Sequence, residues 1–86
     1  MDITIIQEER PYRLISDGLN HFAVLEARCG HVYPVHCDRR HQRPGLLDTT
    51  EGMAVAARHD WTDWNEAAHR FRFMTENEER YAQILW

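Results

Sequence analysis

The amino-acid sequence predicts a small α+β protein: a small antiparallel β-meander of three to four strands, followed by two or three α-helices packed on one face of the sheet. Two observations predict this class. Short apolar and β-branched runs separated by Arg-Pro, Asp-Gly and Cys-Gly pairs fill residues 1–37, as expected for strands joined by tight turns. Apolar residues at three-and-four spacing, preceded by capping residues, fill residues 48–86. Because 86 residues suffice for only one small core, we expect a single domain over residues 1–86, with a basic loop at 38–47.

Four strands are expected in the first half, at residues 2–7, 12–16, 21–27 and 31–37. The Asp-Gly pair at residues 17–18 predicts a turn between the second and third strands. Cys29 and Gly30 are expected to form a two-residue hairpin loop between the third and fourth, with Gly30 at a positive φ. These turns predict two successive hairpins.

The expected hairpin loop at Cys29-Gly30 also determines which side chains share a face of the sheet. The predicted pairs are Arg28 with His31, Glu26 with Tyr33, Val24 with Val35, and Phe22 with Cys37. We expect this face to carry the core. The opposite face, with Ala23, Leu25 and Val32, is also apolar, so we expect it to be covered in part. Because proline cannot donate to a β-ladder, Pro34 predicts that the fourth strand is an edge, where a partner could add.

Helix signals follow the loop. Asp48 with Glu51 three positions later predicts a capped helix from residue 49 to about 58. Asp63 with Glu66 predicts the start of a second helix. Its expected apolar stripe is Trp64, Ala67, Ala68, Phe71 and Met74. A further capping pair, Thr75 with Glu78, leaves two alternatives open: residues 63–86 form one kinked helix, or two helices.

Composition and charge restrict the cellular setting and the partners. All ten basic residues are arginine, whose codons are GC-rich, so we expect a bacterial or phage origin. No apolar run approaches the roughly 20 residues that span a bilayer, and no signal-peptide pattern is present, so we expect a cytoplasmic protein without a transmembrane segment. The net charge is −4, and all of it arises from residues 48–86. Because binding to nucleic acid depends on a basic face, we do not expect nucleic acid as the main partner.

Cysteine and histidine residues near residue 37 raise the possibility of a metal site. Cys29 and Cys37 should lie at opposite ends of one hairpin, too far apart to share an ion or a disulfide. A zinc site could still form from Cys37 and His41, with His36, His59 or His69 brought in by folding, although no paired Cys-x-x-Cys motif is present. A zinc-binding module is therefore one alternative. Otherwise no cofactor is expected.

No catalytic motif stands out, because Ser16 lacks a nucleophile elbow and the four glycines are isolated. We therefore expect a non-enzymatic interaction or regulatory protein whose partner is another protein or a second copy, as in a homodimer. Aromatic and arginine side chains commonly anchor interfaces. The candidate interaction residues are Arg39, Arg40, Arg43, Trp61, Phe73 and Trp86. A nucleic-acid accessory domain that uses the Arg39–Arg43 loop is a further alternative.

Overall fold

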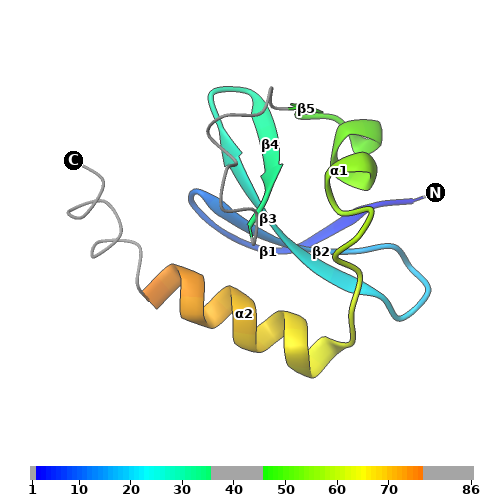
Figure 1. The fold of residues 1–86 in the computed structure, drawn as a ribbon, viewed down its shortest axis with the longest axis vertical. Coiled ribbons are helices and arrows are strands. Elements are labelled where there is room, and N and C mark those ends of the chain that lie inside the picture. Colours follow the sequence, from blue (N-terminus) through cyan, green and yellow to red (C-terminus); the bar gives the residue numbers. More distant parts are fainter. Residues whose placement is uncertain (1, 36–45, 77–86) are drawn as a thin grey trace.

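A computed structural model of the chain describes residues 2–35 and 46–76. The described part is an α+β structure with one antiparallel sheet of five strands and two helices (Figure 1). The strands are β1 (Thr4–Glu9), β2 (Tyr12–Ser16), β3 (Phe22–Arg28), β4 (His31–Pro34) and β5 (Leu46–Leu47), and the helices are α1 (Thr50–Ala56) and α2 (Trp64–Glu76). The strands are adjacent in chain order, β1-β2-β3-β4-β5, so the predicted meander is confirmed.

The first hairpin is longer than the sequence predicts. β1 continues through Glu8 and Glu9, which pair with Arg13 and Tyr12 of β2. The register slips by one residue between Ile5 and Gln7, which is a β-bulge. Ile5 is paired with Ile15 and Gln7 with Leu14, and these adjacent residues of β2 point to opposite faces of the sheet. The side chains of Ile5 and Gln7 therefore also point to opposite faces.

The second hairpin confirms the predicted loop. Cys29 and Gly30 have φ values of 53° and 78°, and both are therefore left-handed, as a two-residue hairpin turn requires. The predicted pairs Arg28 with His31 and Glu26 with Tyr33 are present. The prediction that β4 is an edge strand is wrong for its first half, because Leu46 and Leu47 of β5 pair with it. A two-residue strand carries no periodic pattern, so this one could not be predicted.

The two helices lie on opposite faces of the sheet, and the prediction that they pack on one face is wrong (Figure 1). On one face α2 packs against β2 and β3, and on the other α1 packs against β4 and β5. The core on the α2 side is formed by Tyr12, Leu14, Val24, Val35, Ala67, Phe71 and Met74. The core on the α1 side is formed by Ile15, Ala23, Leu25, Val32, Met53, Ala56 and Ala57. Both faces of β2 and β3 are apolar, so each requires a cover.

The chain passes from one face to the other along β3. Thr62, between the helices, forms two backbone hydrogen bonds of 2.8 Å with Phe22, one in each direction. This bridge occupies the side of β3 that β4 leaves vacant when it ends at Pro34. The short linker can therefore take the chain around the sheet without leaving the backbone of β3 unpaired there.

The helix starts agree with the predictions in position and differ in one cap. Thr49, and not Asp48, caps α1, because its hydroxyl accepts a hydrogen bond of 3.0 Å from the backbone N–H of Gly52. Asp63 caps α2 as predicted, through a bond of 2.8 Å from the N–H of Glu66. Whether residues 63–86 form one kinked helix or two stays open, because residues 77–86 lie outside the described residues.

Candidate interaction surface

Only two of the predicted interaction residues lie in the described part, Trp61 and Phe73, and they differ in exposure to solvent. Trp61 is partly buried and packs against the core on the α1 side, so it contributes to the fold. Phe73 is 55% exposed on α2. The remaining candidates, Arg39, Arg40, Arg43 and Trp86, and the metal candidates His36, Cys37 and His41, lie outside the described residues.

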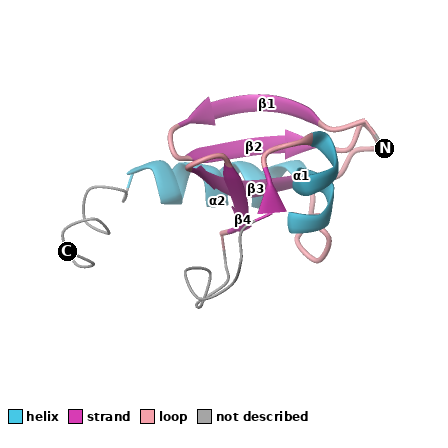
Figure 2. Cartoon of the chain, turned by 90° about the horizontal axis from the view of Figure 1, so that it is seen from above, coloured by secondary structure: helices cyan, strands magenta, loops and turns pink. Residues whose placement is uncertain are grey.

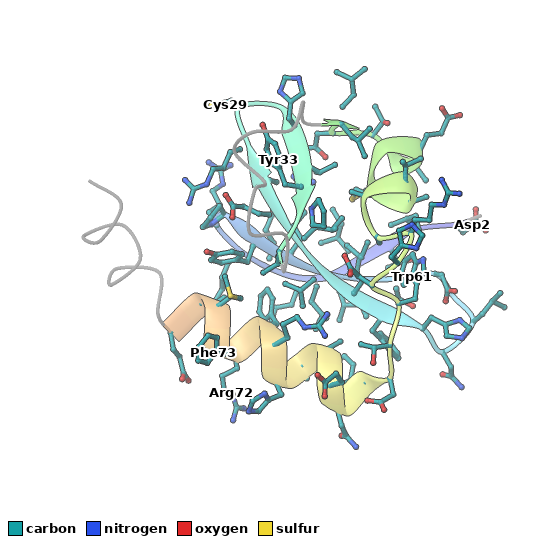
Figure 3. The ribbon with its side chains drawn as sticks, in the orientation of Figure 1. Asp2, Cys29, Tyr33, Trp61, Arg72 and Phe73 are labelled. Carbon is teal, nitrogen blue, oxygen red and sulfur yellow. The ribbon has the colours of Figure 1, made fainter. Side chains whose placement is uncertain are left out.

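Phe73 lies on the outer face of α2, beside Arg72 (Figure 3). Phe71 and Met74 belong to the buried face of the same helix, and a rotation of about 200° separates Phe73 from Phe71. Trp64, expected in the apolar stripe, is instead 47% exposed, with its ring in edge-to-face contact with Phe22 at 5.2 Å between centroids. α2 therefore presents aromatic surface on its outer side and at its start.

β1 is the most exposed element of the sheet. All six of its residues are exposed, and Ile5 and Ile6 are each 42% exposed. It is the outermost strand, and no described strand pairs with its outer side (Figure 2). In an antiparallel strand every second residue directs its backbone N–H and C=O away from the existing neighbour. β1 can therefore accept a further strand, a property that its sequence pattern did not reveal.

Arg13 of β2 connects β1 with the residues that precede α1. The Arg13 Nε donates to Glu8 Oε2 at 2.7 Å, and its Nη2 donates to Asp48 Oδ2 at 2.9 Å. The hydrogen bond with Asp48 raises the pKa of Arg13, and the same bond holds the pKa of Asp48 below its ordinary value. The arginine is charged, and its two partners carry two negative charges, so the group is net negative.

The turn between β2 and β3 is organised around a buried carboxylate. The Asp17 Oδ1 accepts hydrogen bonds from the backbone N–H groups of Leu19 and His21, at 2.7 and 3.2 Å. The His21 Nδ1 lies 2.9 Å from Asp17 Oδ2. Burial raises the pKa of Asp17, but these hydrogen bonds outweigh burial and lower the pKa overall. These hydrogen bonds stabilise the turn. The side chain of Leu19 projects from the turn into solvent.

Glu26 is the most deeply buried acid of the described residues, at 4% exposure. It lies between Tyr12 and Tyr33 on the neighbouring strands, and its Oε2 accepts a hydrogen bond from the Nε of Arg28. An open depression of about 420 Å³ lies beside Arg28, between the tips of the two hairpins. Its lining is Arg10, Pro11, Ala27, Arg28 and Cys29.

Histidine, cysteine and acidic side chains do not gather elsewhere in residues 2–35 and 46–76. Within these ranges no group of three or more could hold a metal ion. The described helices include none that is long and apolar enough to cross a membrane. The exposed apolar features of the described residues include β1 and the outer face of α2.

Comparison of the chain with protein-family models, with curated proteins and with solved structures finds no match.

Proposed function

We propose that this protein is a non-enzymatic interaction module that binds an extended segment of a partner along β1. The observation that carries the proposal is the exposure of the whole strand, with two adjacent isoleucines on it and an outer side that no described strand pairs. Strand addition uses backbone hydrogen bonds for affinity and alternate side chains for specificity. β1 offers both.

The pairing of β1 with the rest of the sheet supports this proposal. Five residues of β1 are paired with β2, and Glu8 is held by Arg13. β2 in turn is buried on both faces, because Leu14 belongs to one core and Ile15 to the other. A partner strand would thus add to a pre-organised template, which reduces the entropy lost on binding.

A random peptide library displayed on phage tests this proposal without knowledge of the natural partner. We expect enriched peptides to be free of proline and to protect the backbone amides of residues 4–9 from hydrogen exchange. Threonine is compatible with a strand and removes apolar surface, so Ile5→Thr should weaken the selected peptides. Val55→Thr, at an exposed apolar residue of α1, is the control. Absence of enriched peptides, or protection confined to other residues, would refute the proposal.

The zinc-binding and nucleic-acid alternatives depend on residues 36–43, which lie outside the described residues. Both stay predictions. Native mass spectrometry with and without a chelator tests the first. Electrophoretic mobility shift with RNA and DNA over a range of salt concentrations tests the second, because phosphate binding weakens steeply with salt.

A further inference from the structure

We infer that the segment bound by β1 comes from a different protein and combines apolar residues with lysine or arginine, rather than being β1 of a second copy. This inference rests on the proposed function of β1. It follows from the charges on the strand, and from the bulge that separates its two halves.

The two halves of β1 differ in character. The first half ends at Ile5 and Ile6, both exposed. The second half carries Glu8 and Glu9, and residues 4–9 contain no basic residue. An added strand would therefore meet an apolar half and an acidic half.

The negative charge is present on both sides of the sheet. Glu9 is paired with Tyr12, which belongs to the core on the α2 side, so the Glu9 side chain lies on that side. Glu8 lies on the α1 side, where one arginine, Arg13, already serves both Glu8 and Asp48. Each side therefore has a carboxylate charge that a basic side chain on an added strand could balance.

The bulge restricts how two copies of β1 could pair. Antiparallel neighbours must point their side chains to the same face. Ile5 and Gln7 point to opposite faces, because Ile5 is paired with Ile15 and Gln7 with Leu14. A register that places Ile5 opposite Gln7 of a second copy is therefore excluded, although it alone would bring Asp2 opposite Arg10.

The neighbouring registers are unfavourable for electrostatic or solvation reasons. Placing Ile5 opposite Ile6 brings Asp2 opposite Glu9, and symmetry repeats this like-charge pair. A shift in the other direction places Ile5 opposite Glu8, so that each copy loses hydration of a carboxylate against an apolar side chain. Parallel pairing of the two outer edges turns one copy over, so equivalent residues point to opposite faces and cannot pair in register. Like charges directly opposite one another destabilise a sheet, so a second copy does not suit this edge.

Two designed peptides, each with blocked ends, test the inference. The basic peptide has two lysines followed by two valines, alternating with threonine, and the acidic peptide has glutamate in place of lysine. Binding is followed by ¹⁵N chemical shifts of β1 in the full chain. We expect the basic peptide to bind at least about ten-fold more tightly at low salt, and the difference to shrink as salt screens the charges.

A charge reversal on β1 provides the second arm of the test. Glu9→Lys should lower the affinity for the basic peptide and raise that for the acidic one. Glu76→Lys makes the same charge change at an exposed position on α2, which packs on β2 and β3, and should leave the preference unchanged.

The possible results separate this inference from the proposed function. Equal binding of both peptides at β1 would overturn the inference and leave strand addition intact. A concentration-dependent dimer in analytical ultracentrifugation, abolished by Ile5→Thr, would show that a second copy occupies the edge, again overturning the inference alone. Binding of neither peptide, without a dimer, would overturn both.

Discussion

β1 and β3 belong to the same sheet, yet they have opposite relations to solvent. Four consecutive residues of β3, from Ala23 to Glu26, are buried, whereas all of β1 is exposed. Residue type alone does not account for the difference, because β1 contains two adjacent isoleucines that are both exposed. The difference comes from the packing of the helices. α2 covers one face of β2 and β3, and on the other face their side chains share a core with those of α1. Strands under both helices hold the domain together, and the strand outside them is available for contact.

The largest expected effect is at a matched pair of isoleucines. Ile15 and Ile5 are cross-strand partners with side chains on the same face, but they are 0% and 42% exposed. We expect Ile15→Ala to lower the free energy of unfolding by about 2–5 kcal/mol, since it leaves a cavity. Ile5→Ala should cost less than about 1 kcal/mol. Urea unfolding of both variants measures this, and similar costs would contradict the description of β1 as peripheral.

A substitution at Gly52 tests how closely α1 packs against β5, at the opposite end of the sheet from β1. A Cβ added at Gly52 would lie 1.8 Å from the Leu47 carbonyl oxygen. Replacing a helical glycine by alanine usually gains about 1 kcal/mol. Here we expect Gly52→Ala to cost about 1–3 kcal/mol, because the backbones must separate. Thermal unfolding measures the effect, and Asn65→Ala, exposed in α2, is the control. A stabilised Gly52→Ala variant would show that α1 does not press on β5.

The pH dependence of stability tests the ionic connection between β1, β2 and α1. The folded-state pKa of Asp48 is lowered by Arg13, so its contribution to stability is present above the unfolded pKa of about 4. The contribution is lost as pH falls through the lower, folded pKa. Asp17 acts in the same direction. We expect Asp48→Asn to reduce the steepness of acid destabilisation without abolishing it. An unchanged slope in urea titrations between pH 5 and about 2 would refute this.

The smallest expected effect is at Phe73, the exposed counterpart of Phe71 on α2. Phe73→Ala should change the free energy of unfolding by less than about 1 kcal/mol, because more than half of the side chain is already in water. Chemical denaturation measures the change. A cost close to that of a core phenylalanine, about 3–5 kcal/mol, would show that Phe73 contributes to the core and would remove it as an interface residue.

Local signals predicted most of the sheet, because turns and hairpin registers depend on a few neighbouring residues. The boundaries of β2 follow from the turn signals around it. Cys29 and Gly30 form the expected loop, and that loop is sufficient to determine the pairing of Arg28 with His31 and of Glu26 with Tyr33. The Asp63 cap is equally local. The cap of α1 was predicted one residue early, since Asp48 could serve either the helix or Arg13, which is distant in sequence.

The sequence by itself therefore determined the α+β class and the order of the main elements, because periodicity and turn chemistry act over a few residues. Only the tertiary structure decided that the helices lie on opposite faces, that β5 covers part of β4, and that β1 is the exposed edge. Those features depend on which apolar surfaces meet. Ile5 and Ile15 are both isoleucines, in neighbouring strands. Ile15 is buried because it belongs to the core that includes α1, and Ile5 is exposed because it lies outside that core.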